Sequence, residues 1–117
     1  MTNTMEKAWK QEMVYRIHEC FDSSLDEDDI CDRVYCDYDP EFTDPSNLSE
    51  EDVLELGGST KFAKRLVEQF DDLSEEKQNK VWNKAEELIK DFGQMLMDEE
   101  EDWVRRKIRK LIKAKTA

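Results

Sequence analysis

Apolar residues recur every three or four positions along most of the chain, as they do on one face of an α-helix. Over residues 5–21 this pattern is carried by Trp9, Met13 and Ile17, and it is most regular between residues 81 and 92. No segment alternates apolar and polar residues for long enough to indicate a β-strand. The sequence therefore predicts an all-α protein in which five to six helices form one bundle.

Capping residues indicate where these helices begin. A serine or asparagine followed three residues later by an acid is typical of a helix start, and the pairs that fit are Asn3–Glu6, Ser24–Glu27 and Ser49–Asp52. Further starts are expected at Ser59 or Thr60 and at Ser74. The second helix should end at Asp39, because the residue before a proline avoids helical geometry and Pro40 follows.

Three places interrupt the helical pattern. Residues 39–48 form an acidic loop that contains both prolines, and we expect Phe42 within it to be exposed. Gly57 should end a short helix after Leu56. Around Gly93 the pattern allows either one bent helix or two separate helices.

A chain of 117 residues has the size of one domain, residues 1–117, and can bury one hydrophobic core. Charged residues make up 41% of it, a share that favours disorder, but three Trp, three Tyr and five Phe at helical spacing favour a fold. The core is expected to contain Trp9, Met13, Ile17, Val34, Phe62, Leu66, Phe70, Val81, Leu88, Phe92 and Ile108.

Acidic side chains are concentrated in residues 22–55, which we call the acidic segment. It contains fourteen carboxylates and one cation, Arg33. Its own net charge, 1 − 14 = −13, is therefore more negative than the −12 of the whole chain. Near the C-terminus, a basic helix is predicted over residues 103–115, and residues 105–115 contain seven cations and no acid. The rest of the chain is close to balance, with 16 acids and 10 bases.

The sequence shows no targeting or membrane-spanning pattern. Residues 1–10 lack the apolar region of a secretory signal, and the apolar runs are a few residues long, as in residues 95–97. Cys20, Cys31 and Cys36 are odd in number and lack C-x-x-C spacing, which favours reduced thiols. We therefore expect a cytoplasmic protein that does not bind a membrane.

The pattern of residues does not indicate a catalytic, metal or cofactor site. Loops that begin at Asp22 or Asp37 lack the glycine and glutamate of a calcium-binding loop, and Gly57 is not followed by the lysine of a phosphate loop. His18, the single histidine, is interpreted as a helix-surface residue. The acids occur in runs typical of solvated faces, whereas hydrolases use a few buried carboxylates. We predict a protein that is not an enzyme and takes no metal or cofactor.

The acidic segment is interpreted instead as a docking surface. Aromatic rings are interleaved with its carboxylates, and this mixture suits an interface in which rings supply contact area and charge steers the partner. A complementary partner is cationic, as nucleic-acid-binding surfaces are. The predicted contact residues are Asp22, Asp26, Glu27, Asp28, Asp29, Asp32, Tyr35, Asp37, Tyr38, Asp39, Glu41 and Phe42. The alternative is a solvated surface that serves solubility.

The basic helix over residues 103–115 has several interpretations. Acids placed four residues before bases, as in Glu101–Arg105 and Asp102–Arg106, stabilise a helix without any partner. The helix could also fold back onto the acidic segment, pair with the acidic segment of a second subunit in a homodimer, or contact nucleic acid. The net charge disfavours nucleic acid as the direct partner.

In size, charge and helical pattern, the chain resembles the small acidic helical proteins that phages use against host restriction or CRISPR machinery, some of which are DNA mimics. It is also similar to acidic immunity proteins that neutralise cationic nuclease toxins. The first resemblance implies an inhibitor that binds a basic, nucleic-acid-handling protein or complex, in the host cytoplasm if a phage encodes it. The second implies an immunity or antitoxin protein, and a self-associating helical module is a further alternative.

Overall fold

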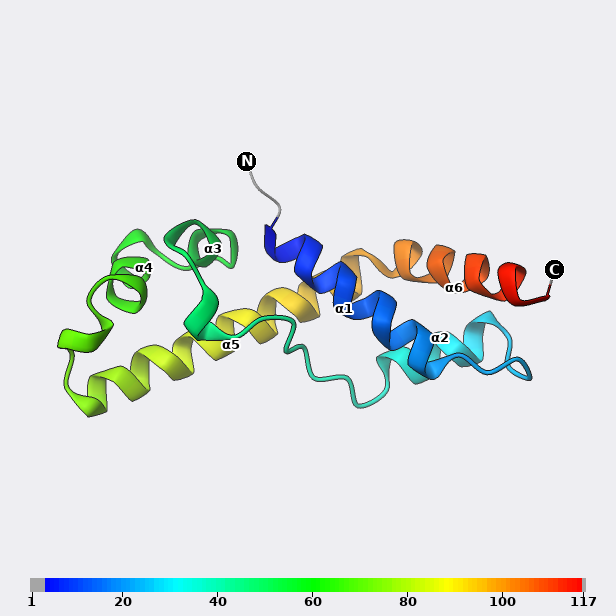
Figure 1. The fold of residues 1–117 in the computed structure, drawn as a ribbon, viewed down its shortest axis with the longest axis horizontal. Helices are drawn as coiled ribbons and strands as arrows, with labels where there is room; N and C mark the ends of the chain where they lie inside the picture. The colour runs from blue at the N-terminus through cyan, green and yellow to red at the C-terminus, as the bar shows by residue number, and fades with distance from the viewer. Residues whose placement is uncertain (1–3, 117) are drawn as a thin grey trace.

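The computed structural model describes residues 4–116, and this part of the chain consists of helices and their connections (Figure 1). None of the described helices is long and apolar enough to cross a lipid bilayer. The prediction of an all-α fold with five to six helices is confirmed. The elements are α1 (Thr4–Cys20), α2 (Glu27–Tyr35), the 3-10 helix η1 (Pro45–Asn47), α3 (Glu50–Glu55), α4 (Thr60–Val67), the 3-10 helix η2 (Phe70–Asp72), α5 (Glu75–Glu99) and α6 (Glu101–Thr116).

Two clusters of apolar side chains form the core of this elongated molecule, which measures 56 × 29 × 19 Å. The first cluster joins α1, α2, α6 and the end of α5 around Trp9 and Ile108. The second joins α3, α4 and the middle of α5 around Val53. Phe42 and Phe92 pack against both clusters. Figure 1 shows α5 running from the α4 end to the middle of the molecule, where it meets α1 and the start of α6.

Seven of the eleven predicted core residues are buried, namely Trp9, Met13, Ile17, Val34, Leu66, Val81 and Ile108. The other four are half-buried at the margins of the clusters: Phe62, Phe70, Leu88 and Phe92. The buried side chains form two clusters in place of the one core expected, because the second cluster packs on Val81, Ala85 and Ile89 of α5 and the first on Leu96 and Met97 near its end.

Several predicted helix ends are confirmed. Ser49 and Asp52 form a reciprocal capping box at the start of α3, and Ser59 and Ser74 cap α4 and α5. Each serine oxygen accepts a hydrogen bond from a backbone N–H that would otherwise lack a partner in the first helical turn. The predicted start at Asn3 lies outside the described residues.

The predicted start of α2 at Ser24 was wrong. The carboxylate of Asp26 caps the helix by accepting a hydrogen bond from the N–H of Asp29 at 2.9 Å. Ser24 instead donates its backbone N–H and its hydroxyl to Asp22, at 2.9 Å and 2.7 Å, in the preceding turn. Serine and aspartate are comparable N-caps, so spacing alone does not choose between them.

The predicted end of α2 at Asp39 was also wrong, because the helix ends at Tyr35. Arg16 of α1 donates from Nε to the carbonyl oxygen of Val34 at 2.6 Å and from Nη2 to that of Cys36 at 2.8 Å. This guanidinium satisfies carbonyl groups at the C-terminus of the helix, so the chain leaves the helix well before the proline. Such a tertiary contact leaves no local signal in the sequence.

The chain between α2 and α3, residues 36–49, crosses α5 and is called the linker. α5 continues through Gly93, and α6 starts after a break at Glu100, so the end of the chain forms two helices. A Cβ atom on Gly93 would lie 2.4 Å from the Cβ of Pro40. A glycine at this position therefore lets the linker lie directly on α5.

Candidate docking surface

The acidic segment spans α2, the linker and α3. Among the described residues, three of its fourteen carboxylates form ion pairs, namely Glu27, Asp28 and Asp39. Eleven carboxylates therefore have no cationic partner within the part of the chain that the structure describes.

Some of these acids hold the local backbone in place. Glu55 accepts hydrogen bonds from the N–H groups of Met5 and Glu6, at 3.0 Å and 3.2 Å, and thereby caps α1 across a long sequence distance. Hydrogen bonds from serine residues hold the pKa of Asp22 and of Asp44 below the ordinary value, so these carboxylates keep their charge. The acids that cap a turn or helix are Asp22, Asp26, Asp44, Asp52 and Glu55.

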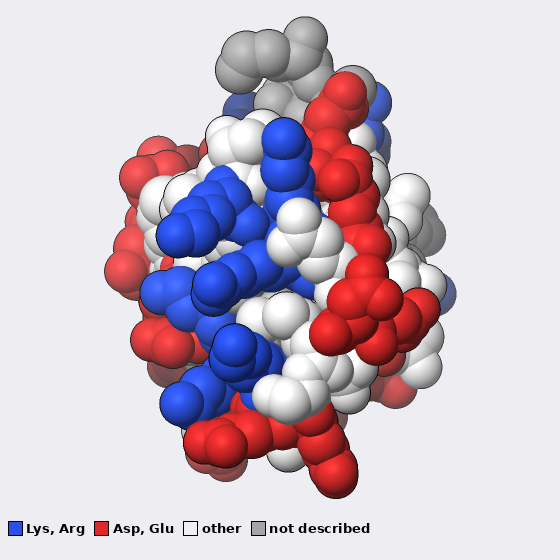
Figure 2. Space-filling view, turned by 90° about the vertical axis from the view of Figure 1, so that its left-hand side faces the viewer, with Lys and Arg blue, Asp and Glu red and all other residues white. Residues whose placement is uncertain are grey.

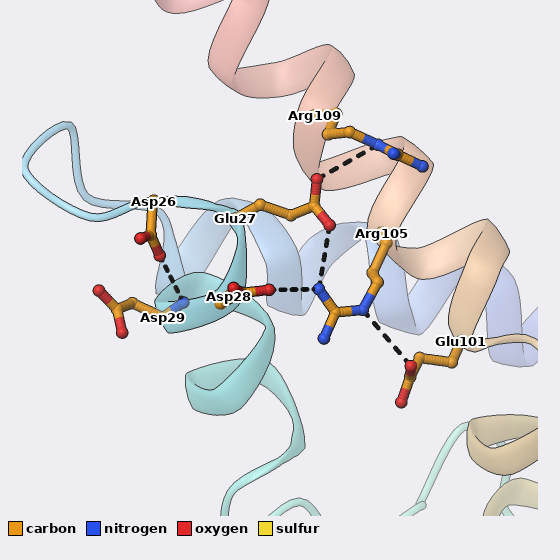
Figure 3. Close-up of polar contacts among 7 residues, drawn as sticks. All are labelled: Asp26, Glu27, Asp28, Asp29, Glu101, Arg105 and Arg109. Carbon is orange, nitrogen blue, oxygen red and sulfur yellow. Dashed lines mark hydrogen bonds and ion pairs between the residues drawn. The ribbon is translucent and has the colours of Figure 1, made fainter.

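The predicted basic helix, residues 103–115, is part of α6, and it folds back onto the start of α2 (Figure 3). Nη1 of Arg105 lies 2.7 Å from Oδ1 of Asp28 and 3.0 Å from Oε2 of Glu27, and its Nε lies 3.4 Å from Glu101. Nε of Arg109 lies 3.3 Å from Oε1 of Glu27. The hydrogen bonds that Arg105 donates to the carboxylates of Asp28 and Glu27 raise its pKa above the ordinary value. Of the alternatives predicted for this helix, the structure shows the one in which it folds back onto the acidic segment of the same chain.

The exposed side of α2 carries carboxylates that form no ion pair with a described residue. Asp29 and Asp32 are exposed and form no ion pair there. The charge of Asp26 raises the pKa of Asp29, with desolvation and the charges of Asp32 and Asp28 acting in the same direction. A cationic partner would remove this repulsion on binding.

The linker brings a second group of carboxylates to α5. Oδ2 of Asp39 lies 3.6 Å from Nζ of Lys90. Glu41 and Asp44 line the same hollow as Glu86 and Lys90 of α5. Three acids of the linker and Glu86 of α5 thus lie near Lys90, and of these four Asp39 forms an ion pair with it.

The three aromatic residues predicted at the interface pack inside the protein. The hydroxyl of Tyr35 donates to a backbone carbonyl of α5 at 2.8 Å, and the ring of Phe42 lies 6.1 Å from that of Phe92. The guanidinium of Arg16 lies 4.9 Å from the ring centre of Tyr38, and burial raises the pKa of Tyr38 to about 12. All three are half-buried, so the expectation that Phe42 is exposed was wrong.

Of the other predicted contact residues, Asp37 and Glu41 are exposed on the linker. Asp37 has a φ of 54°, a left-handed conformation that aspartate tolerates better than most residues. The structure thus brings Glu27 and Asp28 together at α6, leaves Asp29 and Asp32 open on α2, and places Asp39 and Glu41 along α5.

A basic patch lies at the other end of the molecule. Figure 2 shows cations gathered over the end formed by α4 and the start of α5, with acids on both sides of them. One ion pair is found among these cations, between Lys80 and Glu76 at 3.8 Å. The sequence did not predict this patch, because the charges outside the acidic segment and residues 105–115 are close to balance, with 16 acids and 10 bases. The patch forms only when the cations of α4 and α5 come together as the two helices pack. The cations of these elements, all exposed, are Lys61, Lys64, Arg65, Lys77, Lys80 and Lys84.

Within residues 4–116, no three His, Cys, Asp or Glu side chains are grouped so that they could hold a metal ion. His18 is exposed on α1, as expected, and the three cysteines are free thiols. No family model, curated protein or solved structure matches the chain. The charged surfaces are therefore the basis for a functional proposal.

Proposed function

We propose that this protein is a non-catalytic inhibitor that docks through its acidic segment onto a cationic, nucleic-acid-binding surface of another protein. The observation that carries the proposal is the excess of unpaired acids. Even with Arg105 and Arg109 packed on α2, eleven of the fourteen carboxylates have no cationic partner among the described residues.

Charge geometry supports this choice of partner. Like charges on neighbouring turns destabilise a helix, and a complementary surface turns that repulsion into attraction. The Debye length is about 8 Å at physiological salt, so Asp29 and Asp32, three residues apart on one helix, act on a partner together. A surface that binds phosphates has the opposite sign and a similar density of charge. The basic patch on α4 and α5 would repel such a partner, which favours docking at α2 and the linker.

Two variants with the same net charge test the proposal. The docking variant changes Asp29 and Asp32 to lysine, since neither residue caps a helix or forms an ion pair with a described residue. Asp26 and Asp28 are left unchanged, because Asp26 caps α2 and Asp28 binds α6. The control variant changes Glu75 and Glu99, both exposed acids outside the acidic segment, to lysine.

Affinity capture from cell lysate at low salt compares the wild type with both variants. We expect the wild type and the control variant to retain one basic, nucleic-acid-binding protein that duplex DNA displaces, and the docking variant to lose it. Equal retention by all three proteins, or equal loss from both variants, would contradict docking through α2. An immunity protein would use the same surface, and capture of a nuclease toxin would identify that case.

A further inference from the structure

A hollow of about 360 Å³ lies between the linker and α5. Buried Pro40 and Ile89 line it, together with the half-buried rings of Phe42 and Trp82. The ring of Phe70 lies 6.1 Å from that of Trp82 and supports it from outside the hollow. The volume is at the small end of the range of about 300–1,000 Å³ for ligand sites, which suits one long side chain better than a cofactor.

Carboxylates surround this apolar floor. Glu41, Asp44 and Glu86 are exposed at the edge of the hollow. The cation at this edge, Lys90, lies 3.6 Å from the carboxylate of Asp39. Hydrogen bonds from Ser46 hold the pKa of Asp44 below its ordinary value, so its charge is maintained near neutral pH. The hollow therefore combines an aromatic wall with an excess of negative charge.

We propose that this hollow binds an arginine side chain of the partner that docks on the acidic segment, an inference that rests on the proposed function. A planar guanidinium can stack on the indole of Trp82 while it donates two parallel hydrogen bonds to a carboxylate such as Glu86. Its aliphatic stem would cover Pro40 and Ile89. Lysine has a compact, strongly hydrated ammonium group and matches this combination less well.

The partner segment that carries the arginine could continue into a neighbouring hollow. Trp82 and Pro45 line a second hollow, of about 300 Å³, that is next to the first. Leu48 and Leu66 line this second hollow, which makes it suitable for an apolar residue. The proposed ligand is therefore an arginine in an extended protein segment, with an apolar residue near it.

A short peptide tests the arginine site without knowledge of the partner. The probe is acetyl-Gly-Arg-Gly-amide, and the control is the same peptide with citrulline, which keeps the shape of arginine but has no charge. Each is titrated into the full chain labelled with ¹⁵N, and the indole N–H signal of Trp82 is followed by NMR. We expect a saturable shift with the arginine peptide at millimolar concentration and none with the citrulline peptide.

Neighbouring residues on α5 provide matched variants. Glu86→Gln removes a carboxylate from the hollow, whereas Glu87→Gln removes the same charge from an exposed residue that does not line it. We expect Glu86→Gln to weaken arginine binding up to about fivefold and Glu87→Gln to change it by less than twofold. Trp82→Leu, followed through backbone N–H signals near Lys90, should weaken it about two- to fivefold.

An equal response to the citrulline peptide, equal effects of Glu86→Gln and Glu87→Gln, or shifts confined to α2 would overturn the arginine site. Such a result would leave docking intact if the change of Asp29 and Asp32 to lysine still abolished capture. Conversely, the arginine peptide could bind the hollow while the change of Asp29 and Asp32 to lysine left capture of the partner unaffected. That result would contradict docking through α2 and support the arginine site.

Discussion

Replacement of Arg16 by alanine tests how the acidic segment is held against α1. The guanidinium donates to the carbonyl oxygens of Val34 and Cys36, at 2.6 Å and 2.8 Å, and lies 4.9 Å from the ring centre of Tyr38. The variant leaves these carbonyl groups without their donor and removes a positive charge from the C-terminus of α2, where the helix dipole favours a cation.

The expected loss can be worked out from these contacts. Hydrogen bonds to a charged group stabilise by about 1.5–3 kcal/mol, and a cation over an aromatic ring adds about 0.5–1 kcal/mol. Solvent partly reaches Arg16, so we take about 2 kcal/mol for the hydrogen bonds and about 3 kcal/mol in all. This is a large part of the about 5–15 kcal/mol typical of a domain. The charge of Arg16 lowers the pKa of Tyr38, so the pKa of Tyr38 should rise further in the variant.

Urea unfolding followed by circular dichroism measures this loss. The control is Arg106→Ala, which makes the same substitution at an exposed arginine with no ion pair among the described residues. We expect the midpoint to fall strongly for Arg16→Ala with the slope unchanged, and the control to lose less than about 0.5 kcal/mol. Equal losses in the two variants would refute the role given to Arg16 at the end of α2.

Three further predictions concern stability. Arg105→Ala should lower the melting temperature more than Arg106→Ala does, and this difference should shrink in 1 M salt, because exposed ion pairs are screened. Gly93→Ala should lower the free energy of unfolding by about 1–2 kcal/mol in urea titrations, because overpacking against Pro40 outweighs the gain of about 1 kcal/mol in helix propensity. The raised pKa of Tyr38, about 12 in the folded protein against 10.0 ordinarily, should make stability full below pH 10 and progressively lower up to pH 12, and Tyr38→Phe should flatten this dependence in unfolding curves measured at each pH.

The helical fold was predictable because its signals are local. Apolar spacing along α1 and α5, and side chains that cap their own helix, such as Ser49 and Ser74, act within a few residues of sequence. The end of α2 depends on Arg16, which lies 18 residues from Val34 in sequence. The division of the core into two clusters depends on which part of α5 each helix packs against, and the apolar periodicity of the sequence does not indicate this.

The sequence indicates which residues make up the acidic segment, but it does not indicate where their side chains lie in the structure. Counting acids identifies the acidic segment, but it does not separate Asp26, which caps α2, from Asp29, which faces solvent. Glu55 caps α1 through contacts 49 and 50 residues away in sequence, which no short pattern reveals. The hollow beside Trp82 likewise exists only once the linker lies across α5.

The most direct test of the central claim is the salt dependence of affinity for the captured protein, measured by titration with wild type and with the variant in which Asp29 and Asp32 are lysine. Docking through unpaired carboxylates predicts that the affinity of the wild type falls steeply as salt rises from low to physiological concentration, and that duplex DNA competes for the same surface. The variant should bind weakly at every salt concentration. An affinity that is indifferent to salt, or that DNA does not affect, would contradict the account.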